Sequence, residues 1–397
     1  MKILHTADWH LGAKTEGKTR IEEQRKVMSE IVSIAEENKI DVVIIAGDIF
    51  DQAVPTSEAE NLFYETLESL SKNDDRVVIA IAGNHDDPKR LTAGEHFARK
   101  HNVILAGNLS PKIIETEYKN GKIFSSANGS VEIDVKTKRG NEKCVVAMLP
   151  YPAEYRFEEQ SSQDSYAGKV KDWARLVTKG FKRDSVNILA THLMLVGASA
   201  SVCGEDKILR VGDINAISTA DLPHADYYAL GHIHSYQNIK GNACYSGSPM
   251  YFDFNQKTAG VCIIETKTKG GIKSVTFHEL SSPCKMEEIE VRNIDEAEEK
   301  LKTYGDGDIV NITFVQNEPL SMTQIKNLKA TYPCLSKVML RLQNMEVDNN
   351  VYVSNRTKLD AGNLFVEFYK QKRLTEPSRE LIGLFKELME DNSSETN

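Results

Sequence analysis

Five short polar clusters, each at the end of an apolar stretch, contain the residue types that bind metal ions. They are DWH at 8–10, GDIFD at 47–51, GNHDD at 83–87, THL at 191–193 and GHIH at 231–234. Side chains two positions apart on an extended segment point to the same side, so Asp8 with His10, and His232 with His234, can present two ligands together. These clusters predict a metal centre.

The candidate donors are imidazole nitrogens together with carboxylate and amide oxygens, without a thiolate. Such mixed sets suit Mn, Fe or Zn, whereas softer sites recruit cysteine. One bridging carboxylate and several imidazoles can hold two cations about 3.5–4 Å apart, an arrangement suited to phosphoester hydrolysis. A lone Asp-x-His is often only a turn, but five clusters are hard to explain in that way. The candidate ligands are Asp8, His10, Asp48, Asn84, His192, His232 and His234.

A competing motif overlaps the first cluster. Residues 12–19, GAKTEGKT, match the Gly-x-x-x-x-Gly-Lys-Thr pattern of a nucleotide-binding P-loop. A P-loop places its first glycine directly after a strand and binds phosphate at the start of the next helix. Here residues 8–11 intervene, and they include residues that the metal site needs. We therefore favour the metal site, and Lys14 and Lys18 remain candidates for contacts with substrate phosphates.

The elements that must position these clusters alternate between strand and helix. Apolar runs at 1–7, 39–46 and 75–82 precede the first three clusters, and helix-like stretches at 20–38 and 57–71 separate them. This alternation predicts an α/β layered domain. In such folds the binding site is a crevice at the carboxyl ends of the strands, so we expect the five clusters to lie close together there.

The later sequence suggests two further units. Consecutive strand-like runs follow residue 240, and SSPCK at 281–285 is typical of a boundary. The expected units are 1–280, then 285–343 with a β-α-β-α-β pattern, and then 344–397 with a polar linker and a final helix. Leu381, Leu384, Phe385 and Leu388 form an apolar stripe on that helix, which suits docking on a partner helix.

Composition limits the classes of function. The 397 residues are 40% hydrophobic and 27% charged, as in ordinary globular proteins of two or three domains. The net charge of -9 disfavours a general polyanion binder, so a nucleic-acid substrate requires local positive charge or a bound metal. No signal peptide or membrane span is apparent, and we expect a cytoplasmic protein. The six cysteines form no Cys-x-x-Cys pair, and we assign them no functional role.

The series DWH, GDIFD, GNHD, THL and GHIH resembles the motifs of the calcineurin-like metallophosphoesterases. More narrowly, ILHTADWHLG with IAGDIFD and the added C-terminal region is similar to the SbcD-type nuclease subunits. The motifs cover about residues 1–255. The resemblance implies an α/β fold built on a β-sandwich flanked by helices, with 1–280 as the phosphoesterase domain, 285–343 as a small α/β cap domain and C-terminal helices that bind a partner.

The resemblance also implies roles for individual residues and two divalent cations, with Mn²⁺ as the expected metal. His85 is expected to face the substrate and to protonate the departing 3′ oxygen, and Asp51 is expected to orient His85. The first ion is expected at Asp8, His10, Asp48 and His234, and the second at Asp48, Asn84, His192 and His232.

By the same resemblance, the expected function is that of a DNA nuclease subunit in recombination, repair and replication, associated with the nucleoid. It would act as a 3′→5′ exonuclease on double-stranded ends and as an endonuclease on single strands or hairpins. The expected partners are DNA, an SbcC-type ATPase at the C-terminal helices, and a second copy through helices near 58–71 and 90–101.

Three alternatives remain open: a phosphatase, a cyclic-nucleotide phosphodiesterase, and a non-catalytic scaffold that tethers DNA ends. Gln52 follows Asp51 where the related protein phosphatases typically carry arginine. Minimal phosphodiesterases lack so long a C-terminal extension. The intact ligand set and His85 disfavour a scaffold without catalysis.

Overall fold

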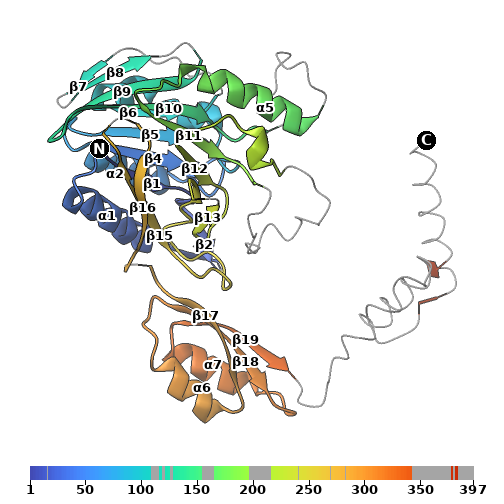
Figure 1. Ribbon diagram of the computed structural model, residues 1–397. Coiled ribbons are helices and arrows are strands. Elements are labelled where there is room, and N and C mark those ends of the chain that lie inside the picture. The colour runs from blue at the N-terminus through green and yellow to red at the C-terminus, as the bar shows by residue number, and fades with distance from the viewer. Residues whose placement is uncertain are drawn as a thin grey trace.

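Two sheets stacked face to face form the larger body, and a smaller cap domain follows it in the chain (Figure 1). This arrangement confirms the predicted α/β fold class. The computed structural model describes residues 1–15, 17–108, 128–153, 165–195, 216–239, 241–268, 270–281, 283–341, 377–378 and 381–382, and the backbone of 116–118 and 121–125.

The six-stranded sheet has the order β16-β15-β1-β4-β5-β6. The strands β1, β4, β5 and β6 are parallel, whereas β15 pairs antiparallel with β1, and β16 antiparallel with β15. The bounds are β1 (Lys2–Thr6), β4 (Val42–Ala46), β5 (Val77–Ile81), β6 (Val103–Ala106), β15 (Gly260–Thr266) and β16 (Ile272–Glu279).

The eight-stranded sheet has the order β13-β14-β12-β11-β10-β9-β8-β7, and β10, β11, β12 and β14 are parallel. The sequence patterns predict β11 and β12, but they do not predict the β9–β10 hairpin. The bounds are β7 (Thr116–Tyr118), β8 (Gly121–Ser125), β9 (Ser130–Thr137), β10 (Gly140–Leu149), β11 (Val186–His192), β12 (Tyr227–Gly231), β13 (Gln237–Ile239) and β14 (Ala243–Tyr245).

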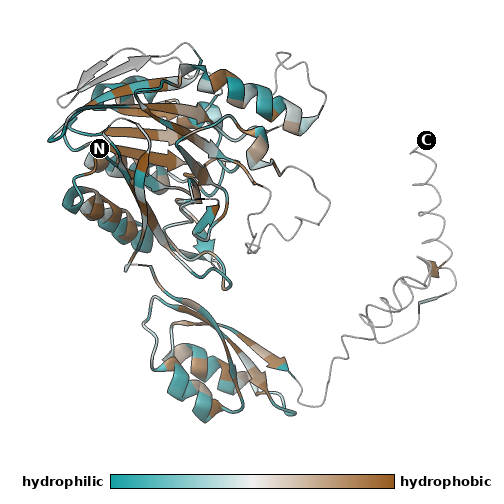
Figure 2. Cartoon of the chain, in the orientation of Figure 1, coloured by the Kyte–Doolittle hydropathy of each residue, from teal (hydrophilic) through white to brown (hydrophobic). Residues whose placement is uncertain are grey.

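The central strands are apolar on both faces because each face is covered. On β4, Ile44 packs in the core between the sheets, and Val43 packs under the helices on the outer side. Burial on both faces explains the continuous apolar runs in the sequence, and Figure 2 shows these strands as the most hydrophobic part of the body. Because the central strands of each sheet are parallel, their carboxyl ends lie together at one edge of the sandwich.

Helices cover the outer faces of both sheets. The helices α1 (Ile21–Glu37) and α2 (Ser57–Ser71) pack on the six-stranded sheet, and α5 (Tyr166–Val177) packs on the eight-stranded sheet. The short helices α3 (Pro88–Leu91), α4 (Glu95–Ala98) and η1 (Arg99–His101) lead into β6. Within the described ranges, no helix is long and apolar enough to cross a membrane.

The cap domain is a three-stranded parallel sheet with two helices, in the β-α-β-α-β order that the sequence pattern indicates. It has its own core, which includes Val291, Ile312, Phe314 and Leu328. Its elements are β17 (Met286–Val291), α6 (Ile294–Leu301), β18 (Ile309–Val315), α7 (Met322–Thr331) and β19 (Leu335–Arg341). The expected partner-binding region at 344–397 lies outside the described residues except at 377–378 and 381–382.

The P-loop-like segment has a different conformation from a P-loop. Strands β2 (Lys14–Thr15) and β3 (Lys18–Thr19) form a small antiparallel hairpin, and α1 begins only at Ile21. Because this hairpin separates Gly12 from the helix, the segment cannot present consecutive amides to a phosphate at the helix start. The match to the nucleotide-binding pattern is therefore coincidental.

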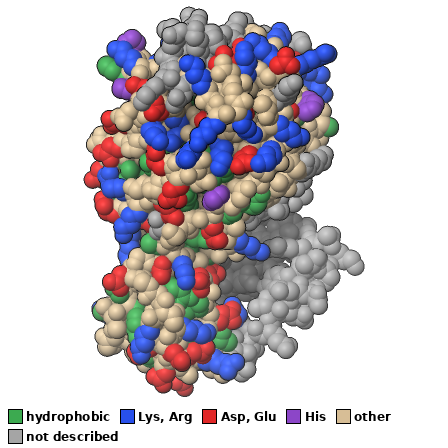
Figure 3. Space-filling view, turned by 60° about the vertical axis from the view of Figure 1, so that its left-hand side comes forward, with side chains coloured by type: hydrophobic (Ala, Val, Ile, Leu, Met, Phe, Trp, Pro, Cys, Tyr) green, Lys and Arg blue, Asp and Glu red, His purple; other side chains and the backbone are tan. Residues whose placement is uncertain are grey.

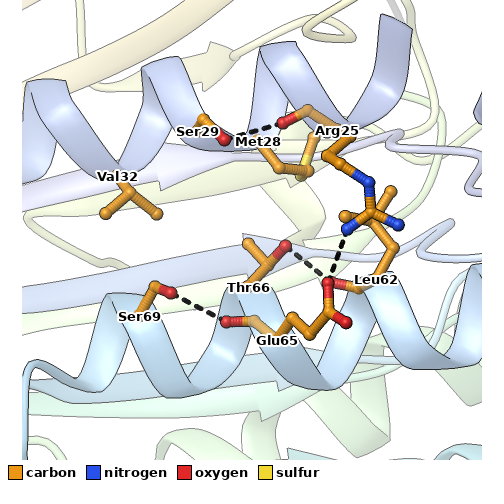
Figure 4. A pocket seen from close by; sticks show the side chains of 8 residues that line it. All are labelled: Arg25, Met28, Ser29, Val32, Leu62, Glu65, Thr66 and Ser69. Atoms are coloured by element: carbon orange, nitrogen blue, oxygen red, sulfur yellow. Dashed lines mark hydrogen bonds and ion pairs between the residues drawn. The ribbon is translucent and has the colours of Figure 1, made fainter. Parts of the chain in front are cut away.

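A groove of about 210 Å³ lies between α1 and α2 on the outer surface (Figure 4). Arg25 and Glu65 form an ion pair across it, with Nη1 and Oε2 2.6 Å apart. The hydroxyls of Ser29, Thr66 and Ser69 donate to carbonyls of their own helices. None of the candidate metal ligands lines this groove.

Candidate metal centre

The candidate ligands meet at the carboxyl ends of β1, β4, β5, β11 and β12. His192 is the last residue of β11, and the other six lie in the loops that follow the remaining four strands. Three of these strands belong to one sheet and two to the other. The site therefore straddles the edge where the two sheets meet.

The backbone of these loops is strained. Asp8, His10, Asp48 and His232 have φ angles of 53°, 44°, 48° and 98°. Positive φ is uncommon for residues other than glycine and costs roughly 1–2 kcal/mol each. Hydrogen bonds between the loops hold this strained backbone conformation in place. The Asp8 amide donates to the carbonyl of Gly47, and the His10 amide donates to the carbonyl of Asp48, both at 3.0 Å. Such local strain is typical of functional sites.

Two glycines allow the clusters to approach each other. A Cβ atom at Gly83 would lie 2.0 Å from Oδ1 of Asp48. A Cβ atom at Gly231 would lie 2.0 Å from the carbonyl oxygen of Ala46 and 2.6 Å from Nδ1 of His192. These separations are impossible between real atoms, so even alanine would push the ligands apart at either position.

His10, His234 and Asp8 form the first ligand cluster. The Nε2 atoms of His10 and His234 lie 3.0 Å apart, and both rings and the Asp8 carboxylate can each place one ligand atom within 4.8 Å of the others. Burial, followed by the charge of His234, lowers the pKa of His10 well below its usual value, and burial lowers the pKa of His234 to about 4. Both rings are therefore neutral at pH 7. Oδ2 of Asp8 is buried without a hydrogen-bond partner among the described residues.

Asn84, His192 and His232 form the second cluster. Oδ1 of Asn84 lies 3.0 Å from both Nε2 of His192 and Nδ1 of His232. Nδ1 of His192 is 2.8 Å from the carbonyl oxygen of Ala46, a contact that requires a proton on Nδ1 and leaves Nε2 toward the site. Burial lowers the pKa of His192, but the carboxylates of Asp48 and Asp8 outweigh it and raise that pKa to about 9. Cation binding must therefore displace a proton here.

Asp48 joins the two clusters. Its Oδ2 lies 3.7 Å from Nε2 of His10 and 3.2 Å from Nε2 of His192, and its Oδ1 accepts a hydrogen bond of 2.9 Å from the His85 amide. Burial raises its pKa, but the nearby histidines, His192 first, hold it well below its usual range. An ionised oxygen facing both clusters, together with the unpartnered Asp8 oxygen, fits a pair of divalent cations.

His85 lies beside the centre and is only partly buried. Its Nδ1 is 2.8 Å from the main-chain carbonyl oxygen of Asp51, while a carboxylate oxygen of Asp51 lies 3.8 Å from Nδ1 of His10. Burial lowers the pKa of His85, but Asp48 and the Asp51 carbonyl outweigh it and raise that pKa. Ligand distances alone also group His85 with His10 and Asp48.

Asp86 has a structural role that was not identified from the sequence. Its Oδ2 accepts hydrogen bonds from the amides of Ile49 (3.1 Å) and Gly83 (2.8 Å), and its Oδ1 accepts one from Phe50 (2.9 Å). The carboxylate thereby ties the loop after β4 to the loop after β5. The sequence feature that could have identified Asp86 is its position directly after His85 in the GNHDD motif.

Tyr151 was also not identified from the sequence. Its ring stacks on His232 with centroids 6.4 Å apart, and it meets the edge of His192 at 6.2 Å. Tyr151 follows β10, a strand that the sequence patterns do not predict, and no polar motif marked it.

The family model for calcineurin-like phosphoesterases matches residues 1–236, which is more than half of the chain. The chain therefore belongs to the calcineurin-like phosphoesterase family. The SbcD component of the nuclease SbcCD from Bacillus subtilis strain 168 is 30% identical over 405 residues, covering 98% of this chain and 97% of that protein. The corresponding SbcCD component from Staphylococcus epidermidis is 24% identical over 375 residues, covering 93% of each chain. Within the phosphoesterases, the chain is a member of the SbcD family, as its motifs indicated.

Proposed function

We propose that this chain is a two-metal DNA nuclease that works with an SbcC-type ATPase. The observation that carries the proposal is the Asp48 carboxylate, whose Oδ2 faces His10 on one side and His192 on the other. The first cation would be held by Asp8, His10, Asp48 and His234, and the second by Asp48, Asn84, His192 and His232.

The chemistry divides between the cations and the side chains. Two divalent cations, with Mn²⁺ proposed, supply Lewis acidity and a lowered pKa for bound water. His85 contributes a proton donor: its Nδ1 is engaged by the Asp51 carbonyl, and its raised pKa favours the protonated ring. We propose that this ring protonates a departing 3′ oxygen. The strained loops keep the ligands in place before substrate arrives.

We extend the proposal to substrate, partner and location by family membership. The activities are 3′→5′ exonuclease on double-stranded ends and endonuclease on single strands or hairpins, within recombination, repair and replication. The SbcC-type partner would bind the C-terminal helices, and the enzyme would act in the cytoplasm at the nucleoid. Figure 3 shows Lys and Arg side chains gathered, with some Asp and Glu among them, on one face of the larger body, so the surface carries local positive charge despite the net charge of -9.

A second copy of the chain is the other proposed partner, through α2 and the α4 region. Tyr64 and Phe97 are exposed large hydrophobics there, at 43% and 70% of their surface. Arg90 pairs with Glu60 at 2.9 Å beside them. Apolar side chains exposed within a polar rim are typical of protein interfaces.

The test is incubation of end-labelled duplex and single-stranded DNA with the purified protein, Mn²⁺ and no ATP. Asp48→Ala should lose at least 100-fold in cleavage rate, in line with the roughly 2.7–4 kcal/mol that one key electrostatic group supplies. Asp221→Ala is the matched control, because Asp221 is a surface carboxylate that pairs only with Lys171 among the described residues.

Equal cleavage by wild type and Asp48→Ala would refute the proposed metal mechanism. If neither protein cleaves DNA, an aryl phosphodiester substrate separates the remaining cases. Hydrolysis of that substrate that depends on Asp48 would show that the metal centre works. The lack of DNA cleavage would then mean either that DNA cleavage requires the partner or that the natural substrate is smaller than DNA.

A further inference from the structure

Arg20 is a buried cation that the proposed reaction does not use. It directly precedes α1, and only 5% of its surface is exposed. Its Nε and Nη2 donate to the two carboxylate oxygens of Glu23 at 2.8 and 2.7 Å. A guanidinium paired in this two-pronged way has a fixed orientation, and burial makes every lost contact costly.

One side of this pair supports the first metal cluster. The Arg20 guanidinium lies 5.7 Å from the ring centroid of Phe252 and donates to the carbonyl of Tyr251. The Phe252 ring packs edge-on against His10 at 5.2 Å and His234 at 5.7 Å. The Phe252 ring therefore restricts the orientation of both imidazoles, and Arg20 holds the Phe252 ring in position.

The other side of the pair holds the start of the cap domain. Oε1 of Glu23, already bonded to Arg20, accepts a hydrogen bond of 2.8 Å from the amide of Cys284. Nη1 of Arg20 lies 3.8 Å from Sδ of Met286, the first residue of β17. Both contacts fall where the chain leaves the larger body and enters the cap.

We propose that Arg20 is a positioning residue that couples the seating of the cap domain to the geometry of the first metal cluster. A displacement of the cap pulls on Glu23 and Met286, shifts the guanidinium, and releases Phe252 from His10 and His234. The proposal rests on the proposed function only in that the first cluster holds a cation. It predicts a larger effect on the first ion than on the second, since the Phe252 ring packs against two ligands of the first cluster.

Lysine cannot replace arginine in this role. A single ammonium cannot form two parallel bonds to Glu23 and at the same time direct a charge over the Phe252 ring, as the guanidinium does. Arg20→Lys keeps the charge, so it separates positioning from simple charge balance. Arg20→Met removes both, and Arg25→Met is the matched control because Arg25 lies on α1 in an exposed ion pair with Glu65.

The first measurement is calorimetric Mn²⁺ titration in an Asn84→Ala background, which weakens the second cluster and isolates the first. Arg20→Met and Arg20→Lys should each weaken the first site about 10-fold or more, the scale typical of residues that orient metal ligands. Arg25→Met should leave it unchanged. The Co²⁺ absorption spectrum should shift in both Arg20 variants, because the orientation of His10 and His234 changes.

A double-mutant cycle with Phe252→Leu tests the route. If Arg20 acts through Phe252, the effects of Arg20→Lys and Phe252→Leu on first-site affinity will be less than additive. Limited proteolysis near residues 280–285 should be faster in Arg20→Lys than in Arg25→Met. The cleavage rate there reports how firmly the start of the cap domain is held.

Wild-type affinity and an unchanged Co²⁺ spectrum in a folded Arg20→Lys protein would overturn the proposal, as would full additivity with Phe252→Leu. These readouts require no DNA cleavage. A protein that binds two cations but leaves DNA intact would therefore count against unaided DNA cleavage and leave this coupling in place.

Discussion

At the scale of single residues, the main chain orients the key side chains as much as other side chains do. His85 contacts a carbonyl of Asp51 through Nδ1 and donates its own amide to Asp48. His192 is fixed by the carbonyl of Ala46 in the same manner. A substitution of the Asp51 side chain therefore leaves the His85 ring in its place.

We predict that Asp51→Asn loses less than about 10-fold in DNA cleavage rate, whereas His85→Ala loses roughly 10²–10⁴-fold. The Asp51 carboxylate helps to raise the pKa of His85, so Asn lowers that pKa. A proton donor fails as pH rises through its pKa, and the alkaline decline in rate should move to lower pH. Rate–pH profiles and Mn²⁺ stoichiometry measure both effects.

The two variants should both bind two cations. If Asp51→Asn were as inactive as His85→Ala, the carboxylate rather than the carbonyl would orient the ring. Loss of a cation in His85→Ala would make His85 a ligand.

At the scale of elements, β1 presents a buried histidine to the eight-stranded sheet. Nδ1 of His5 lies 3.0 Å from the hydroxyl of Tyr227 on β12, and Nε2 has no hydrogen-bond partner among the described residues. Burial lowers the pKa of His5 from 6.5 to about 3. The contact between the two sheets is therefore sensitive to acid.

Below pH 6.5 the unfolded chain binds a proton at His5 that the folded protein excludes down to about pH 3. The free energy of unfolding should fall through this window by up to about 1.4 kcal/mol per pH unit from this group. We predict that His5→Asn, though less stable at pH 7, has a shallower slope by about that amount. Urea denaturation in EDTA from pH 7 to pH 4.5 measures it.

His96→Asn, which removes an exposed histidine, is the control substitution. Equal slopes for wild type and His5→Asn would show that another group governs the acid response.

The same elements show what sequence could predict. Runs such as Val42–Ala46 are buried on both faces, so composition alone revealed the strands, and the polar residues after them revealed the candidate ligands. The β9–β10 hairpin mixes charged with apolar residues, so no clear pattern marked it, and Tyr151 was missed with it. Asp86 was visible in its motif, but its three amide partners come from loops that only the fold brings together.

At the scale of the whole molecule, the exposed aromatic residues Tyr64 on α2 and Phe97 on α4 form the proposed self-association surface. We predict that the double substitution Tyr64→Glu and Phe97→Glu shifts a dimer to monomer in sedimentation velocity, because like charges then face each other across the interface. Metal stoichiometry should not change. Met322→Glu is the control, since Met322 is equally exposed, at 70%, on the cap.

A wild-type protein that sediments as a monomer at micromolar concentration would contradict this interface. A double variant that remains dimeric would place the contact elsewhere.

The position of β1 in its sheet has a consequence for how the protein is made. The loop after this strand carries Asp8 and His10, and the strand is held between β4 and β15, whose last residue is Thr266. On the ribosome, the earliest ligands wait for the partner strand at 260–266 and for His234 before their site can close. A nascent chain therefore cannot assemble the proposed metal centre before residue 234 has been made, and β1 has no antiparallel neighbour before residues 260–266 have been made.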